Sequence, residues 1–336
     1  MRYPDFLDKN NKILMIAPSF GCVTEPYTSR LKKSVEVFKK YGFNPSLGPN
    51  VFSSVGHRSN TCPMCVEEFM DGYQGDYSLL LSVGGGELMN EILDYIDFSK
   101  LKELKPVWFM GYSDNTNLTF TLTTICDVAS IYGGCAPEFG TDDLYLSQLD
   151  FFKLLKGEKL KFRGYPKFEL NSLKDELNPL LGYNLTEDKK LFKSDDFVAF
   201  EGRLIGGCID ILRYLIKTPY DKVDEFIDKY QNDGIIWFLE ACDLNACGLR
   251  LTLLQMKRAG WFRNAKGFIF GRSLNINDSF FSIDMHTAIT EVLEDLNVAY
   301  ILDADIGHLK PQIPIICGSY AKVKADDEIE IEYILK

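Results

Sequence analysis

The sequence predicts a two-domain α/β protein whose first half is built on a parallel sheet. The chain has 336 residues, more than one ordinary hydrophobic core accommodates. In its first half, short apolar runs alternate with amphipathic segments, which is typical of parallel strands joined by helical crossovers. Residues 313–335 alternate apolar and polar side chains, as antiparallel strands do. The second half is therefore expected to be a smaller mixed α/β domain with an antiparallel finish.

Three apolar runs in the first half have the composition of buried strands, and two of them lead directly into a helical pattern. We expect strands at residues 12–18, 77–86 and 106–111, and helices at residues 30–43, 87–97 and 115–129. The strands run into small or polar residues: Pro18 and Ser19, the glycines 84–86, and Gly111 followed by Ser113. Because ligands bind at the carboxyl ends of parallel strands, we expect a site there.

The second half begins after a segment with little periodicity. Residues 151–200 are rich in lysine and aspartate, which predicts a linker with short strands and a mobile surface segment. We then expect a glycine turn into a helix at residues 203–217, strands at 234–242 and 265–273, and a helix at 248–262. These patterns divide the chain into an N-terminal domain at 1–155, a linker at 156–200 and a C-terminal domain at 201–336.

Composition and charge disfavour several classes of partner. The formal net charge is -11 and the sequence pI is about 4.9, whereas nucleic acids and anionic membranes are bound by basic surfaces. The N-terminus lacks the apolar core of a signal peptide, and no stretch reaches the roughly 18 to 20 apolar residues of a membrane span. We therefore expect a cytoplasmic protein whose nine cysteines are reduced. Cys62 and Cys65 form a C-x-x-C motif without a matching second pair, which favours structural cysteines over a zinc site or a redox pair.

The sequence around Ser113 allows two interpretations. A strand, a Gly-x-Ser-x-Asn pattern and a helix follow one another, which resembles the turn that exposes the nucleophile of serine hydrolases. Asn115 replaces the usual final glycine, and asparagine tolerates the left-handed conformation better than most residues. Alternatively, Ser113 or Asp114 only caps the helix. The local pattern leaves both interpretations open.

A nucleophilic serine needs a base, and the chain has only three histidines. His308 follows a glycine in a loop between two strand-like runs, whereas His57 lies in a polar loop and His286 on an expected surface helix. Glu240 ends an apolar strand, where a carboxylate needs a polar partner. The order serine, glutamate, histidine matches one known order of a catalytic triad. Each residue also has an ordinary alternative, as a surface histidine or a solvated acid at a strand end.

Together these segments resemble the LD-carboxypeptidase and microcin C immunity protein family of serine peptidases. The resemblance rests on residues 17–19 (APS), 82–87 (SVGGGE), 111–114 (GYSD), 238–240 (FLE) with Arg250 downstream, and 307–308 (GH). It spans nearly the whole chain, in the family's order. The chain departs from the family at Ser82 and Val83, where many members have an arginine. It also has no tryptophan within residues 151–200, where the immunity proteins stack tryptophan on a nucleobase.

The resemblance implies a serine hydrolase of the LD-carboxypeptidase type. Ser113 would be the nucleophile, His308 the general base and Glu240 its orienting acid. The backbone N–H groups of Gly85 and Asp114 would form the oxyanion hole. Further candidates for substrate contacts are Gly84, Gly86 and Arg250. No metal and no organic cofactor are implied.

The implied fold is a Rossmann-like, glutamine amidotransferase-like domain that carries the nucleophile, followed by a smaller domain that carries Glu240 and His308. Members of the family frequently form homodimers, so the resemblance also implies a homodimer for this protein. The implied substrate is a muropeptide, from which a terminal D-amino acid is released, or a microcin C-like peptide–nucleotide. Two alternatives stay open: a non-catalytic ligand-binding protein on the same scaffold, and another α/β esterase or amidase.

Overall fold

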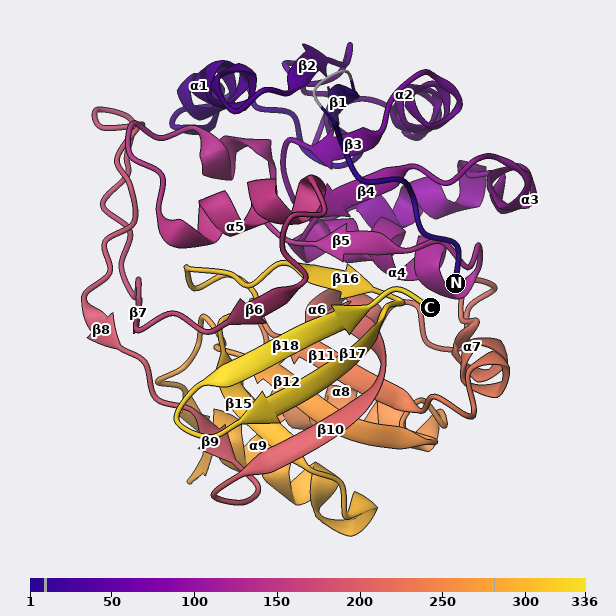
Figure 1. Cartoon of the computed structure of the whole chain (residues 1–336), viewed down its shortest axis with the longest axis vertical. Coiled ribbons are helices and arrows are strands. Elements are labelled where there is room, and N and C mark those ends of the chain that lie inside the picture. Colours follow the sequence, from indigo (N-terminus) through magenta and orange to yellow (C-terminus); the bar gives the residue numbers. More distant parts are fainter. Residues whose placement is uncertain (9–10, 281) are drawn as a thin grey trace.

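The computed structural model describes residues 1–8, 11–280 and 282–336 of the chain. Each half is built on one large sheet, and the N-terminal half lies above the C-terminal half in Figure 1. The predicted fold class is confirmed, because the first sheet is largely parallel and the second is mixed and ends in antiparallel strands. No helix in the described residues combines the length and the apolar character of a membrane span.

The first sheet has six strands in the order β16-β5-β4-β3-β1-β2. Neighbouring strands are parallel except β16, which pairs antiparallel with β5. The strands are β1 (Lys12–Ile16), β2 (Asn44–Leu47), β3 (Leu79–Ser82), β4 (Trp108–Gly111), β5 (Ser130–Tyr132) and β16 (Ile315–Cys317). Side chains alternate along each strand, so Ile13 and Leu79 enter one hydrophobic cluster while Leu14 and Leu80 enter the other.

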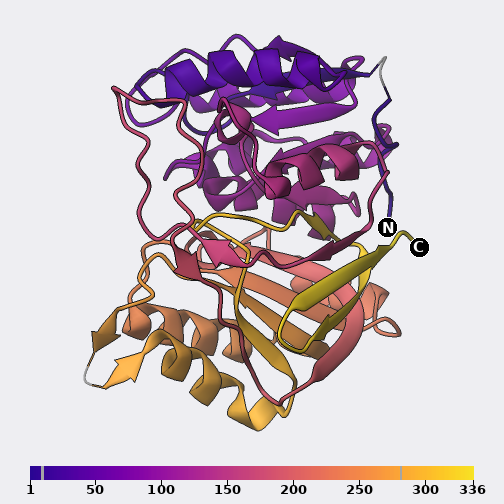
Figure 2. The ribbon, with the colours of Figure 1, turned by 60° about the vertical axis from the view of Figure 1, so that its left-hand side comes forward.

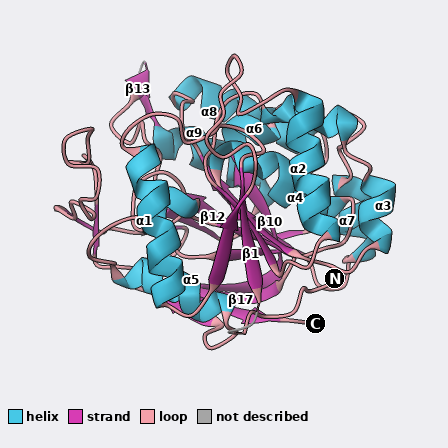
Figure 3. Ribbon diagram, turned by 90° about the horizontal axis from the view of Figure 1, so that it is seen from above, coloured by secondary structure: helices cyan, strands magenta, loops and turns pink. Residues whose placement is uncertain are grey.

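Helices cover both faces of the first sheet. They are α1 (Tyr27–Lys40), α2 (Cys62–Gln74), α3 (Phe98–Glu103), α4 (Thr116–Thr124) and α5 (Leu146–Leu155), with the 3₁₀ helices η1 (Met89–Tyr95), η2 (Ser113–Asn115) and η3 (Ala136–Phe139). α1 and α5 lie on one side of the strands, and α2, α3 and α4 on the other (Figure 3). The segment predicted as a helix at 87–97 is the 3₁₀ helix η1, and β2, α2, α3, β5 and α5 were not predicted.

The second sheet has eight strands in the order β6-β18-β17-β10-β11-β12-β15-β9. They are β6 (Lys161–Arg163), β9 (Phe192–Lys193), β10 (Val198–Cys208), β11 (Ile235–Glu240), β12 (Ala265–Gly271), β15 (Tyr300–Ala304), β17 (Tyr320–Ala325) and β18 (Ile329–Ile334). Its helices are α6 (Ile209–Leu212), α7 (Val223–Lys229), α8 (Ala246–Arg258), α9 (Met285–Leu293) and η4 (Glu294–Leu296). α8 and α9 pack side by side below the sheet (Figure 2). Two small two-stranded antiparallel sheets complete the fold: β7 (Lys167–Phe168) pairs with β8 (Glu187–Asp188), and β13 (Ser279–Phe280) pairs with β14 (Ile283–Asp284).

The predicted glycine turn at residues 203–217 is wrong. Strand β10 runs straight through Gly206 and Gly207 to Cys208, and only the short helix α6 follows. A methyl group on Gly206 would collide with the carbonyl oxygen of Phe238 on β11, and one on Gly207 would lie 2.6 Å from Thr116 on α4. Both glycines therefore serve close packing inside a strand.

Helix α4, which follows the predicted nucleophile, lies between the two halves. All nine of its residues are buried. The hydroxyls of Thr121, Thr123 and Thr124 donate to carbonyls one turn back, whereas the buried Thr119 hydroxyl has no hydrogen-bond partner in the described residues. Thr116 accepts the N–H of Cys208, and Phe120 stacks on Trp261 at 5.5 Å. The site is thus built where the halves meet.

The two sheets exchange segments that are distant in sequence. β16 comes from the C-terminal part of the chain and completes the first sheet, while β6 and β9 come from the middle segment and extend the second. Both hydrophobic clusters contain residues of both halves. The division at residues 155 and 200 stays a prediction.

Candidate active site

Ser113 lies in a tight turn between β4 and α4. Its φ angle of 62° is in the left-handed region, which costs a non-glycine residue roughly 1–2 kcal/mol. The Ser113 N–H donates to the Tyr132 hydroxyl at 3.2 Å, and Asn115 Nδ2 donates to the carbonyls of Tyr112 and Gly84, each at 3.0 Å. The expectation for Asn115 was therefore wrong: its φ is -62°, and it braces the turn through its side chain.

Neither Ser113 nor Asp114 caps helix α4. The N-cap is Asn115, and its side chain makes no capping hydrogen bond within the described chain. The Asp114 carboxylate instead accepts hydrogen bonds from the Ser19 hydroxyl at 2.5 Å, the Met89 N–H at 3.0 Å and the Asn117 amide at 3.0 Å. Burial raises the pKa of Asp114 to about 6, although these donors act in the opposite direction. Asp114 thereby ties the turn to the ends of β1 and β3.

The glycines at residues 84–86 follow β3 and face Ser113. A methyl group on Gly85 would lie 3.2 Å from Ser113 Cβ and 3.3 Å from its Oγ, so only glycine leaves this space open. Within residues 1–8, 11–280 and 282–336, neither the Gly85 N–H nor the Asp114 N–H donates to another protein group. These two N–H groups are therefore available as hydrogen-bond donors beside the Ser113 side chain. An oxyanion hole requires such donors.

Glu240 and His308 meet as a hydrogen-bonded pair. Glu240 ends β11, its side chain is fully buried, and its Oε2 lies 2.9 Å from His308 Nδ1. Because an ionised carboxylate only accepts hydrogen bonds, Nδ1 donates, and Nε2 is the ring nitrogen that this pair does not use. Gly307 has a φ of 99°, and a methyl group there would lie 2.7 Å from the Glu240 carboxylate. The glycine before His308 thus permits this approach.

The hydrogen bonds around Glu240 keep it ionised. Burial acts to raise the pKa of Glu240, but His308 and the hydroxyl of Tyr132, which donates at 2.5 Å, outweigh it, so the pKa lies below its usual value. An ionised acid behind a histidine orients the ring and stabilises the imidazolium form.

Ser113 and His308 line one pocket of about 310 Å³. The glycines 84–86, Tyr112 and Glu138 also line it, together with Phe20, Cys22, Tyr27, Val83, Cys135 and Pro137. No hydrogen bond joins Ser113 to His308 in the described residues. Such contacts often tighten only when substrate is bound.

Glu138 is a pocket residue that the sequence reasoning missed. Its Oε1 accepts from the Tyr112 hydroxyl at 3.2 Å and lies 3.6 Å from Lys310 Nζ. Burial acts to raise the pKa of Glu138, but Lys310, Lys174 and Arg30 lower it to about 2. The Lys310 ammonium lies 4.0 Å from the centre of the Tyr112 ring. The sequence around Glu138 contains no motif, and its 3₁₀ helix η3 is too short to give a helical periodicity.

Several other candidates lie away from this pocket. Arg250 is on α8, pairs with Glu291 and is not among the residues that line this pocket, so its contact with substrate stays a prediction. Cys62 and Cys65 are buried at the start of α2. His57 is exposed in its loop.

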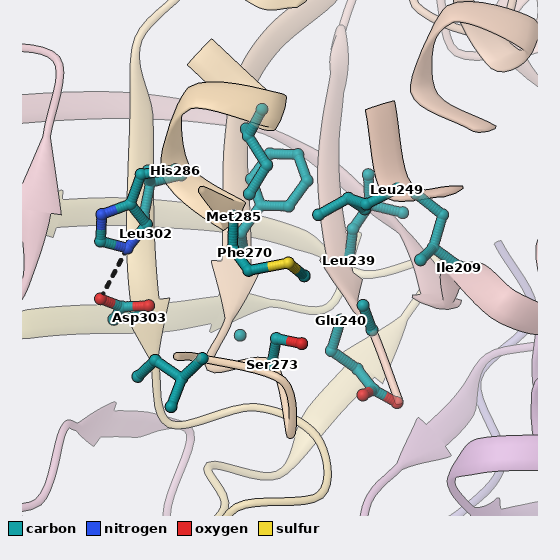
Figure 4. Close-up of a pocket in the computed structure, with 14 residues that line it drawn as sticks. Ile209, Leu239, Glu240, Leu249, Phe270, Ser273, Met285, His286, Leu302 and Asp303 are labelled. Atoms are coloured by element: carbon teal, nitrogen blue, oxygen red, sulfur yellow. Dashed lines mark hydrogen bonds and ion pairs between the residues drawn. The ribbon is translucent and has the colours of Figure 1, made fainter. Parts of the chain in front are cut away.

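His286 forms a second pair with an acid, on the far side of a small cavity from Glu240. Figure 4 shows this apolar cavity of about 20 Å³, with His286 bonded to Asp303 and the Glu240 carboxylate pointing away. His286 Nε2 lies 2.9 Å from Asp303 Oδ2, and the ring packs on Phe192 at 4.3 Å. The Asp303 hydrogen bond raises the pKa of His286 above its usual value. His286 lies on helix α9, as expected, with its side chain half-buried.

Replacing His286 with glutamine is expected to destabilise the protein only at low pH. Because the folded pKa is raised, the contribution of the pair is complete below the unfolded value of about 6.5 and is lost as pH rises through the folded value. The free energy of unfolding of His286→Gln should fall about 1 kcal/mol below wild type at pH 5.5 and approach it at pH 9, measured by urea titration. An equal difference at both pH values would contradict this assignment.

Comparisons with known proteins agree with this arrangement. The family model of the LD-carboxypeptidase N-terminal domain matches residues 13–133, and that of the C-terminal domain matches residues 201–323. The microcin C7 self-immunity protein MccF of Escherichia coli is 23% identical over 89% of this chain and 87% of its own. The probable murein peptide carboxypeptidase of Bacillus subtilis is 22% identical over 98% of this chain and 93% of its own.

The fold also matches a solved structure. MccF in complex with aspartyl sulfamoyl adenosine superposes with a TM-score of 0.81 at 20% identity, over 100% of this chain and 99% of that one. A structural similarity at 20% sequence identity shows only that the two proteins share a fold. The two family models, by contrast, cover most of the chain and include the segments of Ser113, Glu240 and His308. The chain belongs to the LD-carboxypeptidase family.

Proposed function

We propose that this protein is a serine hydrolase that cleaves an amide bond with Ser113 as nucleophile, His308 as general base and Glu240 as the orienting acid. One observation carries the proposal. Ser113 and the histidine that is bonded to a buried glutamate line the same pocket, beside a glycine turn that leaves room for a reacting carbonyl. A binding protein would have no need for a buried, ionised acid behind the histidine.

The reaction follows from these positions. Ser113 Oγ attacks the carbonyl carbon of the substrate while His308 Nε2 takes the hydroxyl proton, and Glu240 stabilises the imidazolium. The backbone N–H groups of Gly85 and Asp114 donate to the tetrahedral oxyanion. His308 then gives its proton to the leaving amine. Water attacks the resulting ester through the same base, which releases the acid and restores the Ser113 hydroxyl.

We further propose an L,D-peptide of the murein type as the first substrate. The relative from Bacillus subtilis is named for murein peptides. All three tryptophans, Trp108, Trp237 and Trp261, are buried in the core, so none is free to stack on a nucleobase. Two aromatic residues of the middle segment are also engaged elsewhere: Phe192 packs on His286, and Tyr183 on Tyr145.

A peptide–nucleotide is the second candidate substrate. The relative from Escherichia coli is a microcin self-immunity protein, and that protein has been solved with an aminoacyl sulfamoyl adenosine. Tyr27 lines the pocket and is 48% exposed, so its ring could stack on a base in place of a tryptophan.

The two substrates are best compared on the purified wild-type protein. We expect release of the terminal D-amino acid from an L,D-linked tetrapeptide, with slower cleavage of an aspartyl sulfamoyl adenosine, both followed by mass spectrometry. A fluorophosphonate probe should label Ser113 alone, as mapped on the digested protein. If neither substrate is cleaved and Ser113 is not labelled, the hydrolase proposal fails and a binding function on this scaffold takes its place.

A further inference from the structure

One tyrosine hydroxyl touches both the nucleophile turn and the acid of the site. Tyr132 ends β5 in the N-terminal half, and its side chain is buried. Its hydroxyl accepts the Ser113 N–H at 3.2 Å and donates to Glu240 Oε1 at 2.5 Å. Ser113 and Tyr132 belong to the first sheet and its turn, whereas Glu240 belongs to β11 of the second sheet. The hydroxyl therefore bridges the two halves at the site.

The bridge has consequences for both of its partners. Ser113 holds a left-handed conformation that is unfavourable for serine, so it depends on surrounding contacts to keep it. The Tyr132 hydroxyl holds the Ser113 N–H, and the N–H of the next residue, Asp114, donates to no protein group in the described residues. On the other side, the donated hydrogen bond occupies the oxygen of Glu240 that His308 does not use. Each carboxylate oxygen then has a fixed donor.

We infer that Tyr132 is a positioning residue that couples the nucleophile turn to the His308–Glu240 pair across the two halves. This inference rests on the proposed roles of Ser113, His308 and Glu240. Tyr132 does not line the pocket, so it acts through its two hydrogen-bond partners and not on the substrate. Burial raises the pKa of Tyr132 well above its usual value, so the hydroxyl keeps its proton and the direction of donation.

Removal of the hydroxyl separates its role from that of the ring. The ring packs against Tyr112 at 6.4 Å and Phe238 at 5.4 Å, and Tyr132→Phe keeps both contacts. The variant leaves the Ser113 N–H and Glu240 Oε1 unpaired, which loosens the turn and makes the carboxylate more basic. We expect kcat to fall about 10- to 100-fold, as for lost supporting hydrogen bonds elsewhere. KM should change little.

The pH dependence of kcat/KM tests whether Tyr132 acts on the His308–Glu240 pair. A purely structural role of Tyr132 would leave this pH profile unchanged. The groups that face Glu240 are His308 on its loop, Tyr132 on β5, Cys208 on β10, and Cys242 after β11, with the Lys310 ammonium further away. Of these, only Tyr132 is altered in the variant. A more basic Glu240 favours the protonated pair, so the acidic limb of the kcat/KM profile should move to higher pH.

Tyr230→Phe is the matched control. The Tyr230 hydroxyl donates to Asp127 at 2.6 Å, which is also a tyrosine–carboxylate hydrogen bond between the two halves, but away from the pocket. We expect Tyr230→Phe to keep the wild-type kcat and pH profile. Equal losses in both variants would mean that Tyr132 only helps the halves to dock, which overturns the inference. An unchanged kcat and profile in Tyr132→Phe would also overturn it.

A substrate-free measurement distinguishes this inference from the proposed function. The chain has three histidines, so NMR signals of the rings can be assigned with His57→Gln and His286→Gln. In Tyr132→Phe the titration of the His308–Glu240 pair should move to higher pH. Genetic incorporation of 3,5-difluorotyrosine at position 132 keeps the hydroxyl and makes it a stronger hydrogen-bond donor, so it should move the titration to lower pH, with the fold checked by the melting temperature. If these shifts occur without hydrolysis by wild type, only the proposed function fails; if neither occurs, the coupling is refuted.

Discussion

Replacing Ser113 with alanine is expected to lower kcat by roughly four to six orders of magnitude. The pocket also holds the thiols of Cys22 and Cys135, but burial raises the pKa of each to about 12, which keeps them protonated and weakly nucleophilic. KM should stay close to the wild-type value, since the pocket walls are unchanged. Product release from the better of the two substrates, followed by mass spectrometry over hours, measures the residual rate. Loss of fluorophosphonate labelling in the same variant would show that the probe reacts at this hydroxyl.

Ser34→Ala provides the control for this substitution. Ser34 is a buried serine on α1, and its hydroxyl donates to the Leu31 carbonyl at 2.8 Å. Removing the Ser34 hydroxyl tests the general effect of losing a buried serine hydroxyl. We expect Ser34→Ala to retain the wild-type kcat. Turnover by Ser113→Ala within tenfold of wild type would eliminate Ser113 as the nucleophile, whatever the other residues do.

Replacing Gly85 with alanine is expected to lower kcat by about 10²- to 10³-fold, the effect of disabling an oxyanion hole. The added methyl group would lie 3.3 Å from Ser113 Oγ and 3.9 Å from the Asp114 nitrogen, which is the space that the oxyanion needs. Gly85 is not among the residues with positive φ, so alanine can adopt its backbone conformation, and the Ser113 side chain needs to move by only a few tenths of an ångström. Melting temperature should therefore stay near that of wild type while kcat falls.

Gly182→Ala is the matched glycine control for the oxyanion prediction. A methyl group on Gly182 would make only ordinary contacts, the nearest at 3.5 Å from the Asp143 carbonyl oxygen. This variant should retain wild-type kinetics. If Gly85→Ala retains them as well, the oxyanion is not stabilised at the glycine turn. If it loses its melting transition, the glycine serves the fold and not the reaction.

Some parts of the site could be predicted from the sequence because their signals are local. Ser113 follows a buried strand, Glu240 ends another, and His308 follows a glycine, and each of these features is read within a few residues. The predicted partnership of Glu240 and His308 agrees with their 2.9 Å contact. The roles of all three residues in catalysis stay predictions until the variants are measured.

Other parts could not be predicted because they depend on contacts between distant segments. The left-handed residue of the turn is Ser113 and not Asn115, since the side chain of Asn115 is drawn to the carbonyls of Tyr112 and Gly84. The glycines at 206 and 207 were interpreted as a turn because glycine breaks most elements. Here they lie within β10, where α4 and β11 leave no room for a side chain.

The amino-acid sequence alone settled the α/β class, the parallel first sheet and the family, because these follow from periodicity and from short motifs in a fixed order. Only the tertiary structure decided how the site is assembled. Tyr132 is 108 residues from Glu240 in sequence, and Glu138 is far from Lys310, yet the fold brings each pair into contact. Hydrogen bonds and ion pairs act over a few ångströms, so such partners become visible only when folding has brought their strands together.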